Sequence, residues 1–283
     1  MRTSLALAAL VLALGSSVAE AQTPPPAFEL ALRESDCMDA VHAALAVADE
    51  APAPEPPVAP PPRNESVTEP VAPPPTPPPT PRVTVPRDRT VASLSEDACL
   101  GMLRSHDVDF HRLDPAEARG VGIPIRLDGP LAGITVRSRG HSELHEIVDC
   151  RLAVALLAWA PELHEAGVVE VHHYSTYRPG ARVGGSRRRS GHANALAIDL
   201  AVLVMRDGSE REILTAWESR ARGAAPCDDD HDEGPESASL RRLVCSVAED
   251  ELFQIVLTPH YDAAHANHVH LELRPGVSWQ YVH

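Results

Sequence analysis

The chain has 283 residues, and its 40 aspartates and glutamates outnumber its 25 basic residues, which gives a formal net charge of −15. Every basic residue is arginine, so neither a P-loop lysine nor a lysine Schiff base is available. The acidic balance also argues against nucleic acid as a partner, because such binding rests on phosphate neutralisation.

The first 21 residues have the pattern of a secretory signal peptide. Arg2 precedes an apolar run, Leu5–Leu14, and the small residues Ala19 and Ala21 match a cleavage site. The run is too short to span a bilayer, and no cysteine at the cleavage point would carry a lipid. We therefore expect a periplasmic or secreted protein with no transmembrane anchor after cleavage.

The next two segments differ in composition. Residues 22–50 include a short stretch of helical composition, whereas 51–92 are rich in proline; 19 of the 28 prolines lie between Pro24 and Pro86. Proline-rich chains adopt the extended polyproline II conformation and cannot build a core. We expect a disordered linker over 51–92 and one folded domain over 93–283.

The domain mixes helical and strand patterns without a regular alternation. Ser95 can cap its first helix, and period-two alternation marks several strands. In chain order we expect a helix at 96–105, strands at 108–110 and 134–136, a helix at 145–165, strands at 168–175 and 196–204, helices at 211–222 and 237–247, and strands at 252–258 and 268–273. This order predicts an α+β fold with a small, mostly antiparallel sheet and flanking helices.

Four of the five cysteines lie in the domain, as suits an oxidising compartment. Four cysteines allow three pairings. We favour Cys227–Cys245, which would close an acidic stretch at 228–236, and this leaves Cys99–Cys150. Cys37 is then either free or paired between chains.

Two segments place histidine where chemistry is expected. His192 precedes by seven residues Asp199, a carboxylate within an apolar strand, and such a group needs a cation when buried. Downstream, His268 and His270 share one face of a strand because side chains alternate. The alternative for Asp199 is an ion pair with a nearby arginine.

His192, Asp199 and His270 offer the imidazole and carboxylate ligands that zinc takes. Three protein ligands leave the fourth tetrahedral position open, which is the pattern of a catalytic site. His265 lies just before the strand and can reach the same face. The sequence thus predicts a Zn²⁺ cofactor on these three ligands.

These residues also resemble a known family. The pattern Ser190-x-His192-x-x-Ala195-x-Ala197-x-Asp199, followed by His268-x-His270, resembles that of zinc D-alanyl-D-alanine peptidases, which belong with the lysostaphin-type group. The element at 174–178 (YSTYR) and the segments VLTP and DAAHANHVH are closer to the bacterial extensin-like C-terminal domain. The likeness runs from about residue 95 to the C-terminus.

The resemblance implies zinc on His192, Asp199 and His270, with His268 and Arg178 as catalytic residues. Tyr177 and Ser190, beside Arg178, would bind substrate, and His265 would support the ligands from outside. The motif glycine is replaced by Ala195, and Asn267 stands where relatives often have aspartate.

The function implied is zinc-dependent hydrolysis of peptide or amide bonds in peptidoglycan, with its stem peptide as the substrate. The alternative is a non-catalytic zinc-containing module that binds the cell wall.

Overall fold

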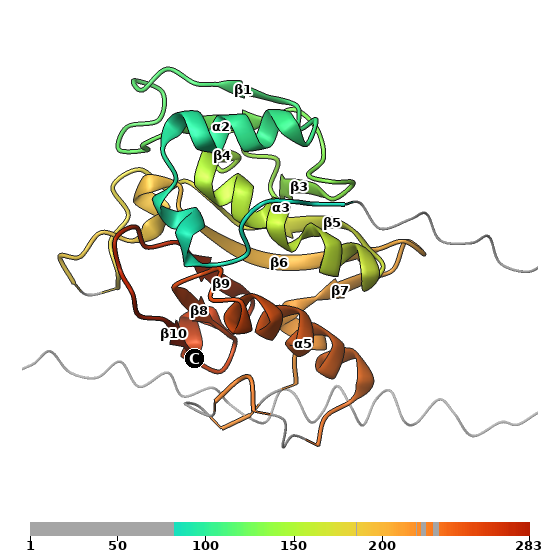
Figure 1. Ribbon diagram of the computed structural model, residues 1–283. Coiled ribbons are helices and arrows are strands. Elements are labelled where there is room, and N and C mark those ends of the chain that lie inside the picture. The colour runs from blue at the N-terminus through green and yellow to red at the C-terminus, as the bar shows by residue number, and fades with distance from the viewer. Residues whose placement is uncertain (1–81, 185, 219, 222–224, 229–231) are drawn as a thin grey trace, which may run out of the picture. The chain divides into compact units, whose positions relative to one another are not determined.

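The computed structural model describes residues 82–184, 186–218, 220–221, 225–228 and 232–283 (Figure 1). The expected signal peptide, the segment 22–50, Cys37 and most of the expected linker lie outside these residues. In chain order the elements are η1 (Arg89–Ser93), α2 (Glu96–Ser105), β1 (Phe110–Arg112), β2 (Pro124–Leu127), β3 (Thr135–Ser138), β4 (Ile147–Asp149), α3 (Cys150–Glu165), β5 (Val168–His173), η2 (Gly191–Asn194), β6 (Ala197–Met205), β7 (Glu210–Glu212), α4 (Ile213–Ala216), α5 (Pro235–Glu249), β8 (Ile255–Leu257), η3 (Ala263–His265), β9 (Val269–Glu272) and β10 (Tyr281–Val282).

The main sheet has seven strands in the order β10-β8-β9-β6-β5-β3, with β7 paired to β6. The pairs β8–β10 and β3–β5 are parallel, and the remaining pairs are antiparallel. A second sheet joins β1, β2 and β4. The α+β class is confirmed. The main sheet, however, is larger than expected, and it is mixed, since parallel pairs lie at both of its ends.

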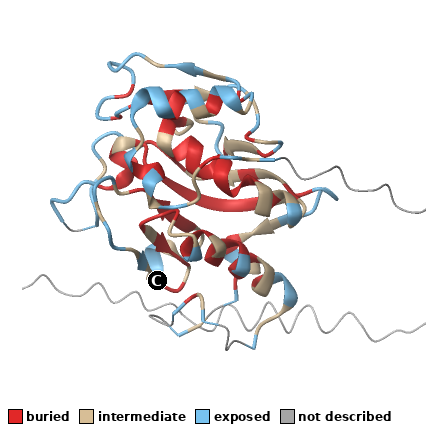
Figure 2. Ribbon diagram, in the orientation of Figure 1, coloured by how far each residue is buried: buried red, intermediate tan, exposed pale blue. Residues whose placement is uncertain are grey.

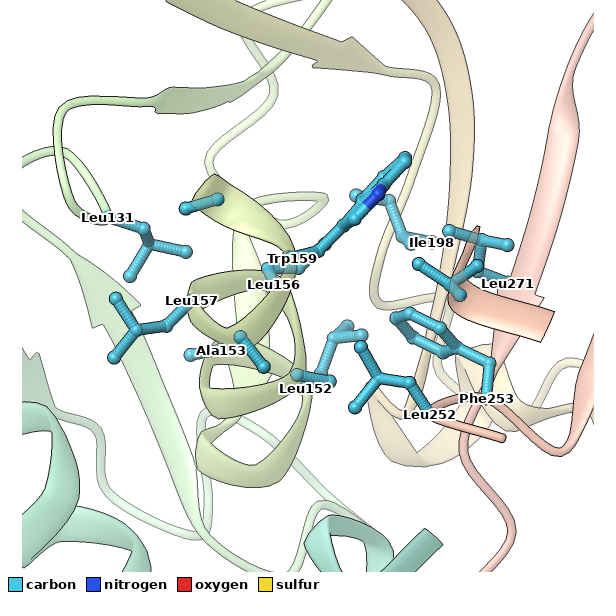
Figure 3. Packing of buried hydrophobic residues seen from close by; sticks show 14 of the residues in the cluster. Leu131, Leu152, Ala153, Leu156, Leu157, Trp159, Ile198, Leu252, Phe253 and Leu271 are labelled. Atoms are coloured by element: carbon cyan, nitrogen blue, oxygen red, sulfur yellow. The ribbon is translucent and has the colours of Figure 1, made fainter. Parts of the chain in front are cut away.

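The core forms where α3 packs on the centre of the main sheet. Leu152, Leu156 and Trp159 of α3 point toward Ile198 of β6 and Leu271 of β9 (Figure 3). Buried residues follow α3 and β6, whereas the loops and β1 are exposed (Figure 2). Because side chains alternate along a strand, the neighbours of Ile198 and Leu271 point away from α3. The opposite face of β6 and β9 is therefore free to carry polar groups.

Residues upstream of 93, which we had assigned to the linker, pack against the domain. Val85 and Val91 are buried in the main core. Arg87 pairs with Glu162 of α3 and with Asp250, which follows α5. The packed part of the chain therefore includes residues before the expected boundary.

Two disulfides close the domain. Cys99 of α2 is bonded to Cys150, the first residue of α3, and Cys227 is bonded to Cys245 of α5. Both expected pairings are confirmed. The first bond ties α2 to α3, and the second ties Cys227, which precedes the acidic stretch, to α5.

Removal of these bonds gives a first prediction. In the chain-entropy account a longer closed loop contributes more stability. Sequence separations of 51 and 18 residues correspond to about 4 and about 3 kcal/mol. We expect Cys99→Ala/Cys150→Ala to lower the free energy of unfolding more than Cys227→Ala/Cys245→Ala. Urea titrations measure both losses, and the reverse order would contradict the loop account.

Candidate metal centre

Three neighbouring elements bring His192, Asp199 and His270 together. Asp199 of β6 and His270 of β9 are directly opposite each other in the antiparallel register. Both point to the face of the sheet away from α3, since their neighbours Ile198 and Leu271 face that helix. His192 comes from η2, whose first turn is capped by the Ser190 hydroxyl. The local folding of these segments thus joins residues that are up to 78 positions apart.

The three side chains form a compact, buried cluster. Asp199 Oδ1 lies 2.9 Å from His192 Nε2 and 2.9 Å from His270 Nδ1. The two imidazole nitrogens are 3.2 Å apart. All three residues are less than a tenth exposed. Their ligand atoms lie close enough together to hold one metal ion.

The outer nitrogens of both imidazoles determine which atoms face inward. His192 Nδ1 lies 3.0 Å from the Thr176 carbonyl oxygen, and His270 Nε2 lies 3.1 Å from Glu272 Oε2. Because these oxygens can only accept, each neutral ring donates from its outer nitrogen and turns a bare lone pair inward. Two nitrogens and one carboxylate oxygen then converge, and three acceptors this close require a cation. The donor set fits zinc.

The titration behaviour agrees with a place for positive charge. Burial lowers the pKa of His270, but hydrogen bonds to Asp199 and Glu272 outweigh this effect and raise the pKa to about 9. Burial raises the pKa of Asp199, but His192 and His270 hold it well below its usual value. Burial lowers the pKa of His192. Without a metal, a proton on His270 therefore lies between two ionised carboxylates.

Glu272 supports the cluster from behind. Its carboxylate accepts from His270, pairs with Arg274, and accepts from the Gly191 backbone N–H at 3.1 Å. A carboxylate behind a ligating imidazole fixes the ring and raises its basicity. We had not singled out Glu272 from the sequence. Period-two alternation could have found it, since it follows His270 by two residues on the same strand face.

Gly191 gives a second prediction, because a side chain there would collide with that carboxylate. A Cβ at Gly191 would lie 2.5 Å from Glu272 Cγ and Cδ. We expect Gly191→Ala to displace Glu272 and to weaken metal binding by about 10–100-fold, the usual effect of losing such a partner. Gly184→Ala, with open space around it, is the matched control. Competition with a chromogenic chelator measures both affinities, and equal values would contradict this role for Gly191.

The cluster opens on one side into a cleft of about 880 Å³. Arg178, Ser190, His265 and His268 line this cleft, as the sequence interpretation requires of residues near the substrate. The Arg178 guanidinium is half-exposed, with Nη2 3.5 Å from Asp199 Oδ2. His265 Nδ1 donates to Asp262 Oδ1 at 2.6 Å, and the His265 ring lies 5.0 Å from that of His268.

His268 stands beside the three ligands with one nitrogen tied down. Its Nδ1 lies 2.9 Å from Asn267 Oδ1, and the Asn267 amide donates to the Tyr174 hydroxyl. Its Nε2 lies 3.4 Å from Asp199 Oδ1. Burial lowers the pKa of His268 to about 4, so the ring is neutral at pH 7. Asn267 thus orients His268 although it replaces the expected aspartate. Tyr174, the first residue of the element at 174–178, in turn holds Asn267.

Tyr177 does not lie where substrate could reach it. It is only 1% exposed and packs in a small second core with Val121, Ile147 and Ala195. Its hydroxyl donates to the Arg119 carbonyl oxygen at 2.9 Å. The expectation that Tyr177 binds substrate is therefore corrected: its ring anchors the loop that carries Arg178. A buried tyrosine in a motif satisfies its hydroxyl internally.

Ala195, in the glycine position of the motif, adopts a left-handed backbone with φ of +53°. Glycine adopts this conformation without steric cost, whereas alanine does not. The turn that brings His192 back toward β6 thus explains why the pattern carries glycine there. This chain keeps the turn with alanine.

One comparison with known proteins gives a match. A family model described as "Extensin-like protein C-terminus" matches residues 97–282. No curated protein and no solved structure matches the chain. The matched range includes every residue of the metal cluster and of the cleft.

Proposed function

Because the chain belongs to the extensin-like protein C-terminus family and holds a His–Asp–His cluster at an open cleft, we propose that it is a zinc-dependent hydrolase. The bonds it cleaves are peptide or amide bonds of the cell wall, with peptidoglycan stem peptide as substrate. The likeness of its two-part motif to that of zinc D-alanyl-D-alanine peptidases supports this choice of reaction and of substrate.

The observation that carries the proposal is the convergence of three bare acceptors beside a cleft. His192, Asp199 and His270 supply two nitrogens and one oxygen, and no fourth protein ligand closes the group within the described residues. Structural zinc sites have four protein ligands, whereas catalytic sites have three and an open position. When bound, zinc supplies Lewis acidity and acidifies water.

The surrounding side chains have the roles that hydrolysis needs. His268, neutral and held by Asn267, presents Nε2 as a proton acceptor at the cleft. Arg178 presents a permanently charged, forked donor to a substrate carboxylate or to the oxyanion. His265 packs against His268 and is held by Asp262. Ser190 lines the cleft, and its side chain caps the turn that contains His192.

We further propose that the protein acts in the periplasm or outside the cell. Two disulfides support an oxidising compartment, because cytosolic thiols stay reduced. Among the described residues, none of the helices has the length and apolar character needed to cross a membrane. The proposal also includes the signal peptide expected over 1–21, for which the support comes from the amino-acid sequence.

The test combines metal analysis with digestion of stem peptides followed by mass spectrometry. We expect one bound zinc per chain and a hydrolysed peptide or amide bond, both lost after chelation. Zinc without any product would favour the alternative, a non-catalytic cell-wall-binding module that contains the metal. Neither zinc nor product would contradict both functions.

A further inference from the structure

Positive charge is concentrated in one segment beside the cleft. Between Glu170 and Asp199 the chain has five arginines and no acidic residue, although the whole protein has a net charge of −15. Arg178, Arg182 and Arg188 of this segment line the cleft, and Arg274 joins them after β9. A cleft lined by one sign of charge attracts ligands of the opposite sign.

A closed hairpin holds these arginines in place. Arg182 and Arg189 form an antiparallel bridge, and the Val183 N–H donates to the Arg188 carbonyl oxygen at 2.9 Å. Arg182 also donates from Nη1 to the Arg187 carbonyl oxygen at 2.7 Å. Within the part of the chain that the structure describes, no ion pair engages Arg182 or Arg188. Their charges are therefore available to a ligand.

The carboxylates of the cleft are already engaged. Asp199 contacts His192 and His270, and Glu272 contacts His270 and Arg274. Asp262 is held by His265. The charge that the cleft offers to an incoming molecule is thus positive.

The C-terminal part of the chain gives the same cleft an apolar region. Tyr261, Trp279 and Tyr281 are 36%, 48% and 40% exposed. Together with Val183 they are four of the six large hydrophobic side chains exposed among the described residues, and all four line this cleft. Tyr261 and Tyr281 pack edge to face with centroids 6.1 Å apart. Exposed apolar groups gathered in one place mark a binding surface.

We propose that this cleft binds an extended anionic peptide. At least two carboxylates of the peptide pair with the arginines of the cleft. Of these arginines, Arg182 and Arg188 lie beyond the metal cluster. An apolar side chain of the peptide packs on Trp279, Tyr261 and Tyr281. The inference rests on the proposed function in one respect: the bond to be cleaved is taken to lie at the metal cluster. Recognition itself needs no hydrolysis, so the two can be tested separately.

Trp279 provides the readout. The other two tryptophans, Trp159 and Trp217, are buried, so a ligand in the cleft changes the fluorescence of Trp279. The probes are an acetylated, C-terminally amidated pentapeptide with two glutamates and one leucine, and the same peptide with glutamine in both glutamate positions. With the full zinc-loaded chain we expect about tenfold tighter binding of the acidic peptide at low salt, and less preference at high salt.

Variants locate the effect. Arg182→Gln/Arg188→Gln should lose most of the preference for the acidic peptide, because Arg178 alone of this segment then still faces the cleft. Arg104→Gln/Arg242→Gln removes the same charge from exposed positions of α2 and α5 and should keep the preference. Equal binding of both peptides by the unaltered chain, or an unchanged preference in the first variant, would overturn the inference. If the chain prefers the acidic peptide but digests no stem peptide, the inference is supported and only the proposed hydrolysis is contradicted. If it digests stem peptide but shows no preference for the acidic peptide, hydrolysis is supported and the inference is contradicted.

Discussion

Replacing any one of His192, Asp199 and His270 by alanine should abolish stoichiometric zinc binding. Loss of an outer partner alone reduces metal affinity by about 10–100-fold, so loss of a direct ligand should cost more than about 100-fold. The ligand atoms of the three side chains lie within 3.2 Å of one another. Among the described residues, the other imidazole beside Asp199 Oδ1 is that of His268, whose Nε2 is farther away at 3.4 Å.

Stability should follow the metal. A ligand that binds only the folded state stabilises it by about 4 kcal/mol when present at a thousand times its Kd. The melting temperature of the unaltered protein should therefore rise with added zinc and fall with a chelator, whereas those of the three variants should respond to neither. His111→Ala, at an exposed histidine paired with Asp128, is the matched control and should behave as the unaltered protein does. A variant that retained one zinc per chain would contradict the assignment of that ligand.

Element positions could be predicted wherever a cap or a clear period marks them. Ser95 caps a helix with the expected bounds, Glu96–Ser105. The expected helix over 145–165 is shorter because Asp149 caps it, and Ile147–Asp149 before it form β4. Apolar residues in so short a run fit a strand as well as a helix. Pairing with β2, which is distant in sequence, decides between them.

The expected helix over 211–222 is the clearest error among the elements. Residues Glu210–Glu212 form β7 on the edge of β6, and among the described residues of this range only Ile213–Ala216 are helical. A strand of three residues cannot be recognised from its own sequence, because its stability comes from the partner strand. The size of the main sheet escaped prediction for the same reason, since β7 and β10 are both this short.

The motif predicted which residues the fold brings together at the site. It did not predict all of the residues that surround them. His192, Asp199 and His270 meet as expected. Strand alternation puts Asp199 and His270 on one face of neighbouring strands, and the turn after η2 brings His192 back toward β6. The contact of Glu272 with Gly191 joins residues 81 positions apart, and no local pattern reveals such an approach. The resemblance implies that Tyr177 binds substrate, whereas packing against residues far from it in sequence buries it.

Replacing His268 by alanine should leave zinc bound and reduce turnover by about 10²–10⁴-fold, the usual contribution of a residue that transfers a proton. His268 lies beside the metal cluster, and its Nδ1 is held by a neutral amide, that of Asn267. The outer nitrogen of His270 is held instead by the carboxylate of Glu272. An imidazole backed by a carboxylate is the better metal ligand. We therefore expect His270 to bind the metal and His268 to be the ring that transfers a proton.

The control separates the two histidines. Asn267→Asp gives His268 a carboxylate partner like that of His270 and should keep zinc at one per chain while changing the pH dependence of turnover. Zinc content and peptide hydrolysis are measured for all three variants, His268→Ala, His270→Ala and Asn267→Asp. Loss of zinc in His268→Ala together with its retention in His270→Ala would reverse the roles of the pair, because the ring that binds the metal is the one whose removal releases it.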